Sequence, residues 1–266
     1  MTKVLKIVQI LALATGITAA TGAAHAKEGE TLHGSSVIGI AAIPEYEGAD
    51  KLDIIPFVNG RLTLGERYIA IEGVTLRANV LATEGFEFGP VANLTFGRDA
   101  EIKSTAVARF GNIDDAYEVG GFAAASFPVG ENGRARAALQ AVHDVSNVHD
   151  GWVATLSGGY SHQISDSFSV GLEASASYAD DNYARTYFSV TPAGALASGL
   201  PAYNAKRGLK DIGGMLTAGY QVTPSWSVNA YGSYRRMLGN FADSPVVDRQ
   251  GNANQFSAGV GIGFAF

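Results

Sequence analysis

Two kinds of chemistry are conceivable from the polar side chains of this sequence, metal binding and nucleophilic catalysis. His143-Asp144 and His149-Asp150 stand in one polar segment, where imidazole and carboxylate groups could coordinate a metal ion. Their spacing matches no standard metal-ligand motif, and solvated loop residues of this kind are common. The sequence therefore predicts neither a metal site nor a cofactor.

A hydrolase would need a nucleophile, a base and an orienting group within reach of one another. His162 lies near Ser161 and Ser165, but the alternation of side chains along a strand places His162 and Ser161 on opposite faces. No convergent set of such groups is evident. We therefore predict that the protein is not an enzyme.

A third set consists of six charged side chains that alternate with apolar residues along predicted strands. They are Arg77, Glu87, Glu118, Arg134, Arg136 and Glu173. If these strands enclose a lumen, one interpretation is a charged interior that selects solutes or ions. The other, which we favour, is a network of ion pairs that fills a small barrel, because both signs of charge are present and charges in a narrow interior need partners.

The elements that would position these charges are β-strands, and the clearest is the last one, QFSAGVGIGFAF at residues 255–266. Its apolar residues alternate with small or polar residues, which predicts a strand with one apolar face and one polar face. A glycine-lined inner face and a terminal phenylalanine favour a closed membrane barrel over a soluble sandwich. The strand also resembles the terminal signal by which bacterial outer-membrane barrels are recognised and inserted. The signal residues would be Phe256, Val260, Ile262, Phe264 and Phe266.

The amino terminus and the composition agree with an envelope protein. Lys3 and Lys6 precede an apolar run and an Ala24-His25-Ala26 cleavage pattern, so residues 1–26 are expected to be a signal peptide cleaved near Ala26. Residues 27–266 would form a single barrel domain. The net charge of −6 argues against nucleic acid as a partner, and the absence of cysteine excludes disulfides and thiolate metal sites. No later apolar run is long enough for a transmembrane helix.

Alternating segments along the rest of the chain predict an all-β, antiparallel, up-and-down transmembrane barrel of about twelve strands. If the carboxyl end is periplasmic, the periplasmic turns are all short. They fall at residues 64–67, 82–85, 129–133, 162–167 and 222–225. The extracellular connections at residues 97–115, 179–210 and 238–254 are long, as bacterial barrels require.

Three segments are less regular. A short hairpin is expected over residues 67–82, with arms at residues 67–71 and 74–82 joined at Glu72-Gly73. The charged loop at residues 97–115 is expected to carry a short helical or strand-like insertion. The loop motifs at residues 182–203 and 235–247 mix aromatic residues, prolines and charges, and either they bind an outside partner or one of them folds inward as a plug. The sequence leaves both alternatives open.

Several ordered motifs resemble the MltA-interacting protein/OmpV family of outer-membrane proteins. They are PEYEGAD (residues 44–50), Gly89-Pro90 leading to Gly97-Arg98, NYARTYFSVT (182–191), SGLPAY (198–203), YRRMLGN (234–240) and ADSPVV (242–247). The resemblance covers essentially the whole chain after residue 26. One departure is Phe264, where the pattern has tyrosine.

The resemblance implies a barrel in the bacterial outer membrane, surrounded by lipid, without catalytic activity. For one branch of the family it implies a scaffold that joins a lytic transglycosylase to a peptidoglycan synthase. Other branches look like surface adhesins or stress-regulated envelope proteins. The alternatives to a scaffold are a narrow passive pore for small solutes and an adhesin that acts through the long extracellular loops.

Overall fold

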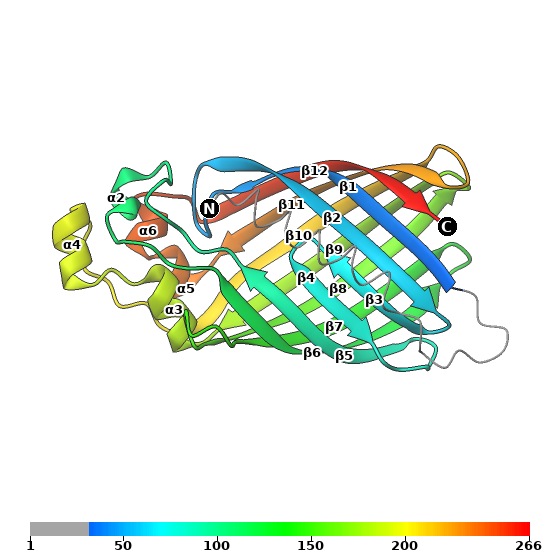
Figure 1. Ribbon diagram of the computed structural model, residues 1–266, viewed down its shortest axis with the longest axis horizontal. Helices are drawn as coiled ribbons and strands as arrows, with labels where there is room; N and C mark the ends of the chain where they lie inside the picture. Colours follow the sequence, from blue (N-terminus) through cyan, green and yellow to red (C-terminus); the bar gives the residue numbers. More distant parts are fainter. Residues whose placement is uncertain (1–31) are drawn as a thin grey trace.

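A computed structural model describes residues 32–266, which form one closed barrel of twelve antiparallel strands (Figure 1). The expected signal peptide lies outside the described residues. The strands are β1 (Leu32–Pro44), β2 (Leu52–Leu64), β3 (Arg67–Glu72), β4 (Thr75–Asn79), β5 (Phe86–Thr95), β6 (Ala116–Val129), β7 (Gly133–Asp144), β8 (Trp152–Ser165), β9 (Phe168–Ala179), β10 (Gly208–Gln221), β11 (Trp226–Met237) and β12 (Asn254–Ala265).

The barrel closes where β12 pairs with β1. Ile262 lies opposite Ile38 and Val260 opposite Ile40, and every other strand pairs with its neighbours in sequence. Closure leaves no end strand with a free edge, which a β-structure in lipid requires. The predicted up-and-down barrel with short turns at one end and long loops at the other is confirmed.

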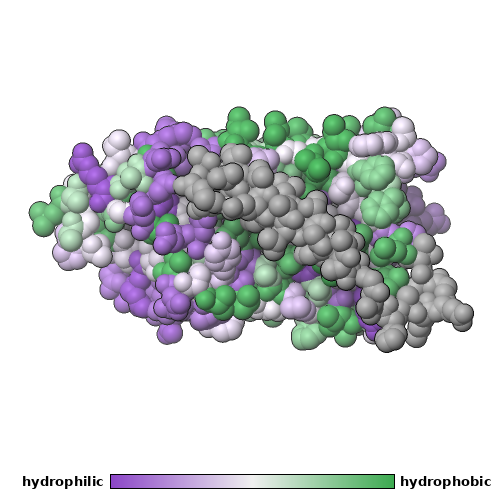
Figure 2. Space-filling model, in the orientation of Figure 1, coloured by the Kyte–Doolittle hydropathy of each residue, from purple (hydrophilic) through white to green (hydrophobic). Residues whose placement is uncertain are grey.

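The outer wall of the barrel is apolar. All five residues of the expected terminal signal on β12 lie on the exposed face, and the rings of Phe256 and Phe264 contact Tyr234 and Trp226 at centroid distances of 5.0 and 4.9 Å. These two pairs lie near opposite ends of β11 and β12, as the aromatic girdles of membrane barrels do. In Figure 2, hydrophobic residues are visible along the upper and lower borders of the barrel, and hydrophilic residues gather toward the end that carries the helices.

Gly259 on the inner face of β12 and Gly39 on β1 make room for two aromatic rings from other strands. A Cβ on Gly259 would collide with the ring of Tyr231, and one on Gly39 in β1 would collide with Phe57. The two rings meet edge to face inside the barrel, at a centroid distance of 6.0 Å. The glycine-lined face is therefore a packing requirement of the lumen.

The β3–β4 hairpin is the irregular part of the wall. It is shorter than expected, because its second arm ends at Asn79 and does not reach residue 82. The Asn79 side chain accepts hydrogen bonds from the backbone N–H groups of Leu81 and Phe88 and donates to the carbonyl of Glu66. These side-chain bonds take the place of the backbone hydrogen bonds between strands at this end of β4. At the other end the hairpin turns at Glu72 and Gly73, well below the extracellular rim.

The long loops fold into a helical cap over the extracellular end (Figure 1). Its helices are α2 (Thr105–Ala108), α3 (Asp181–Phe188), α4 (Pro192–Ser198), α5 (Gly239–Ala242) and α6 (Pro245–Asp248). In residues 97–115 the expected short insertion is thus a helix. Among the described residues no helix is long and apolar enough to cross a membrane.

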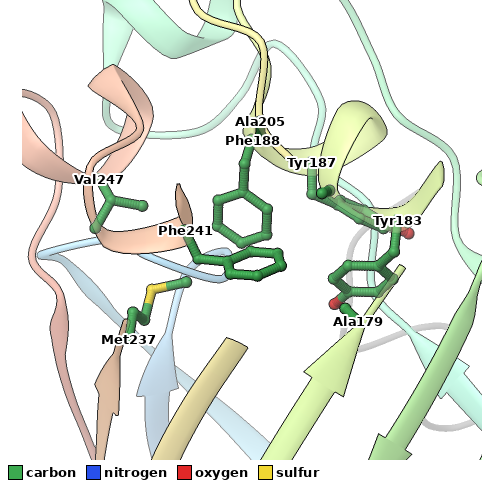
Figure 3. Close-up of a cluster of buried hydrophobic side chains, with 9 residues drawn as sticks. Ala179, Tyr183, Tyr187, Phe188, Ala205, Met237, Phe241 and Val247 are labelled. Carbon is green, nitrogen blue, oxygen red and sulfur yellow. The ribbon is translucent and has the colours of Figure 1, made fainter. Parts of the chain in front are cut away.

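The cap has a hydrophobic core of its own, drawn in Figure 3. Phe188 and Phe241 meet edge to face at 5.2 Å, and both are fully buried. Ser244 joins α6 to α3, because its hydroxyl donates to the carbonyl of Phe188 at 2.6 Å. Arg98 joins the loop at residues 97–115 to α3 by donating to the carbonyl of Tyr187 at 3.0 Å. The long loops therefore cover the end of the barrel as one packed layer.

Replacing Gly259 with leucine tests the packing inside β12. We expect Gly259→Leu to destabilise the barrel by about 1–3 kcal/mol, because the new side chain competes with the Tyr231 ring for the same space. Ala258→Leu is the matched control, since Ala258 is exposed on the lipid face. The denaturant concentration that unfolds the barrel is the measurement. Equal midpoints for the two variants would contradict this view of the inner face.

Candidate functional site

The candidate site is the barrel lumen, which contains three hollows in series. A rim pocket at the periplasmic end has a volume of about 490 Å³ and includes Arg61 in its lining. Arg61 also lines a central cavity of about 710 Å³. Gln140 and Thr155 line both this cavity and an upper cavity of about 380 Å³ that lies under the cap. Three hollows therefore follow one another between the periplasmic rim and the base of the cap.

The central cavity holds charges of both signs. Arg136 donates to the carboxylate of Glu87 at 2.8 Å, and Arg77 lies 3.2 Å from the carboxylate of Glu72. Arg77 also donates to Gln140 at 3.4 Å. Glu173 lines the same cavity. The wall thus offers both donors and acceptors to a molecule in the lumen.

The six charges singled out from the sequence occupy three different places. Arg77, Glu87, Arg136 and Glu173 lie around the central cavity or are paired with a residue that lines it. Glu118 lies higher, in the lining of the upper cavity, and its side chain is only 2% exposed. Arg134 is exposed next to the periplasmic turn before β7. Four of the six are therefore brought together.

His149 and Glu118 form a buried pair below the cap that the sequence did not indicate. Nε2 of His149 lies 3.1 Å from Glu118, and the His149 side chain is fully buried. Asn93 and Thr95 of β5 donate to the second oxygen of Glu118, at 2.6 and 3.1 Å. The rings of Tyr183 and Tyr187 pack against the imidazole. Strand alternation alone could place Glu118 inside, but nothing in the sequence marks its partner.

The loop that suggested a metal site has a different architecture. His143 packs on the exposed Trp152, at a ring distance of 4.8 Å, whereas His149 points into the barrel. Asp144 accepts hydrogen bonds from the backbone N–H groups of Ser146, Val148, His149 and Asp150. The two histidines thus lie on opposite sides of the wall, and the Asp144 carboxylate organises the loop.

His162 likewise does not face a serine. Its Nδ1 atom is hydrogen-bonded to the hydroxyl of Tyr160 at 3.1 Å, and both residues are exposed on the same face of β8. Ser161 lies on the other face of the strand. His162 therefore contacts a tyrosine hydroxyl and not the serine that a Ser-His pair would need.

A cluster of four residues holds the cap to the barrel, and we call it the latch. Lys210 at the start of β10 pairs with Glu47 and, at 3.0 Å, with Asp211, while Tyr183 of α3 donates to Glu47 at 2.6 Å. Only 6% of the Lys210 side chain is exposed. A register shift between Leu209 and Asp211 lets both charged neighbours be buried. This shift has no signature in the sequence.

The pKa values of Tyr183 and Arg98 keep both side chains protonated, as their hydrogen bonds to Glu47 and to the Tyr187 carbonyl require. Burial, together with the negative charge of Glu47, raises the pKa of Tyr183 well above its usual value, so its hydroxyl remains a donor. Burial lowers the pKa of Arg98 to about 10, which still leaves its guanidinium charged at neutral pH. Both groups therefore keep their hydrogen bonds to the cap across the physiological range.

A sequence model for the MltA-interacting protein MipA family matches residues 37–266. The chain belongs to this family. The match spans eleven complete strands of this MipA-family barrel, part of β1 and the whole cap, so the resemblance seen in the motifs is confirmed. The family and the fold together make it a protein of the outer membrane. No curated protein matches the chain significantly.

Solved structures similar to this MipA-family barrel are outer-membrane channels. The NanC porin aligns with a TM-score of 0.45 and 9% identity over 86% of this chain and 98% of its own. An outer membrane channel from Pseudomonas putida F1 aligns with a TM-score of 0.47 and 12% identity over 92% of this chain and 97% of its own. The channel DcaP of Acinetobacter baumannii aligns with a TM-score of 0.43 and 11% identity over 92% of this chain and 100% of its own. At this distance the comparison carries no functional argument.

Breaking the latch of this MipA-family barrel should loosen its cap. We expect Lys210→Met to cost about 3–5 kcal/mol locally, because it leaves the buried carboxylate of Asp211 and the partly buried carboxylate of Glu47 without their cation. Amide exchange at Ala184, which is hydrogen-bonded to the carbonyl of Asp180, would then accelerate.

The control is Lys51→Met, because the Lys51–Asp50 pair is largely exposed and contributes at most about 1 kcal/mol. Unchanged exchange at Ala184 in a folded Lys210→Met barrel would show that the latch does not hold the cap.

Proposed function

We propose that the protein is a narrow, capped channel for small polar solutes. The observation that carries this proposal is the series of three hollows, linked by Arg61 and then by Gln140 and Thr155. A barrel whose interior only served stability would be filled by its own side chains. This lumen instead contains spaces of the size that small ligands occupy.

The lining favours molecules that carry hydrogen-bonding groups or both signs of charge. Three arginines and two glutamates line the central cavity, while three glutamates, one lysine and one arginine line the upper cavity. A solute that moves upward passes from the more basic to the more acidic of these two spaces. Such a lining attracts small zwitterions and polar neutral solutes and disfavours large or strongly apolar ones.

The cap makes passage conditional. The latch and the buried aromatic residues of the cap close the extracellular end, whereas the periplasmic turns are too short to do so at the other end. Transport would therefore require the cap to move as a unit. The favoured network of ion pairs and the selective lumen are compatible, because the pairs line the cavities and do not fill them.

Deleting the middle of the cap tests the channel directly. We expect the intact protein to conduct little in a planar bilayer, and a variant with residues 182–206 replaced by a short Gly-Ser linker to show stable unitary conductance, because α3 and α4 are then gone. In this background Arg136→Ala should shift the selectivity toward cations, since it removes a lumen cation, while Leu139→Ala on the lipid face should not. A folded deletion variant that stays silent would refute the channel.

A second candidate function is the docking of an envelope enzyme in the periplasm. The observation that favours it is the family description, which names an interaction with MltA. We infer that a lytic transglycosylase, and with it a peptidoglycan synthase, would contact the periplasmic rim, because the cap lies on the other side of the membrane. The short turns offer a small surface there.

Crosslinking in intact cells, followed by purification of the barrel, tests this docking. If the barrel is a scaffold, a lytic transglycosylase or a peptidoglycan synthase is recovered with it. Recovery should fall when charged residues replace the exposed Val222 and Val129 beside two periplasmic turns, and should persist when they replace Leu196 in the cap. Absence of both enzymes from a correctly inserted barrel would count against docking and would leave the channel untouched.

A further inference from the structure

The barrel wall has a gap above the β3–β4 hairpin. β2 continues up to Leu52, but its pairing with β3 ends at Asn59, opposite Glu72. On the other side, β5 pairs with β4 only up to Asn93. Two strands of the wall are therefore absent over the upper half of β2, and lower down the hairpin joins β2 to β5 through six β2–β3 residue pairs and three β4–β5 residue pairs.

Backbone groups of β2 face this gap. The carbonyl of Val58 accepts a hydrogen bond from Gly73 at 3.0 Å, so the even-numbered residues of β2 direct their backbone toward β3. The backbone groups of Ile54 and Pro56 point in the same direction. Among the described residues, no hydrogen-bond donor contacts the carbonyl of Ile54 or of Pro56. Pro56 has no N–H to satisfy, which suits a free edge. Above them, Lys103 closes the gap by donating to the carbonyl of Leu52 at 2.8 Å.

The gap lies at the level of the hydrocarbon. Pro56 is paired with Ile40 and Ile40 with Val260, which is midway along β12 between Phe256 and Phe264. Ile54, next on the same face of β2, is 73% exposed. An unpaired backbone carbonyl in contact with lipid tails is unfavourable by several kcal/mol. The edge therefore needs water or a polar group of another molecule beside it.

Both lumen cavities reach the gap. The upper cavity is lined by Val74, at the tip of the hairpin, and by Leu94 and Phe96. Leu94 lies on the same side of β5 as the exposed Phe86 and Phe88 but is itself buried, and it lines the cavity together with Thr95 and with Phe96, which follows β5. The central cavity reaches Gly73 and Asn59 from below. Both cavities therefore border the hairpin tip, where the gap in the wall begins.

An unsatisfied cation lies directly behind this tip. Arg77 in β4 is paired across the hairpin with Ala70, and its guanidinium lines the central cavity. Its Nε–H is buried and has no hydrogen-bond partner among the described residues, although its other end contacts Glu72 and Gln140. A buried donor of this kind favours an anionic acceptor that enters from the gap.

We propose that the gap is a lateral opening that admits a single-chain anionic amphiphile from the outer leaflet. The chain lies between the free edge of β2 and the Leu94–Phe96 segment, and the head group reaches Arg77. Apolar side chains at the wall and a guanidinium inside it match the two ends of such a molecule. The proposal goes beyond the channel for polar solutes and does not depend on it.

Photo-crosslinking in lipid bilayers tests the opening with palmitate that carries a diazirine in its chain. We expect saturable labelling of peptides that contain Val74 and residues 94–96, competed by unlabelled palmitate. Val74→Trp, which fills the opening, should reduce this labelling about tenfold, whereas Val228→Trp on the lipid face of β11 should not. Val74→Ala, which leaves the opening free, should retain it and serves as the second variant at this position.

The head-group assignment has its own readout. Arg77→Gln should weaken labelling by palmitate about tenfold and leave labelling by the corresponding diazirine hexadecanol unchanged. Even labelling around the barrel, for example at Leu172 and Leu216, or a folded Val74→Trp variant that labels like the wild type, would overturn the opening. Equal loss of both probes in Arg77→Gln would overturn the role of its charge.

Discussion

The structure depends on one constraint, that backbone N–H and C=O groups within the hydrocarbon must be hydrogen-bonded inside the protein. Pairing of β12 with β1 meets this requirement by closing the sheet, and the register Ile262 to Ile38 keeps the apolar residues of both strands on the outside. A shift by one residue would turn Val260 and Ile262 inward and the glycines outward. The same constraint makes the gap above the β3–β4 hairpin notable, because among the described residues no strand pairs with the upper half of β2 on that side.

Charge burial is the second constraint, and it explains how the cap and the lumen are joined. Lys210 pairs with both Glu47 and Asp211 at the top of the barrel, and Tyr183 adds the contact to α3. His149 and Glu118 do the same a short distance away. Pairs of this kind contribute little net stability but are costly to break, so they favour one position of the cap over others. The closed end is therefore specified by polar contacts as well as by the Phe188–Phe241 core.

The sequence allowed the barrel itself to be predicted, because a period of two is a local property. The alternation along residues 255–266 and the difference between short and long connections led to the correct strand number and orientation. The end of β4 at Asn79 was missed, since it depends on the Asn79 side chain donating to the carbonyl of Glu66 in the preceding turn and accepting from the N–H of Phe88 in β5. The latch was also missed, because Glu47 and Lys210 lie 163 residues apart and meet only through a register shift in β10. Arg77, Arg136 and Glu173 could be placed inside by alternation, whereas the spaces between them depend on how Phe57 and Tyr231 pack.

The central claim is that the lumen is hollow and open toward the periplasm but closed toward the outside. The most direct test uses Ser175→Cys, which places a thiol in the central cavity of a chain that has no native cysteine. A membrane-impermeant maleimide added to intact cells should label this thiol slowly, and the same reagent should label it readily once it has access to the periplasm. Lys51→Cys on the exposed first loop reports the rate for a thiol outside the cap. If Ser175→Cys in intact cells reacts as fast as Lys51→Cys, the extracellular end is open and the account is wrong.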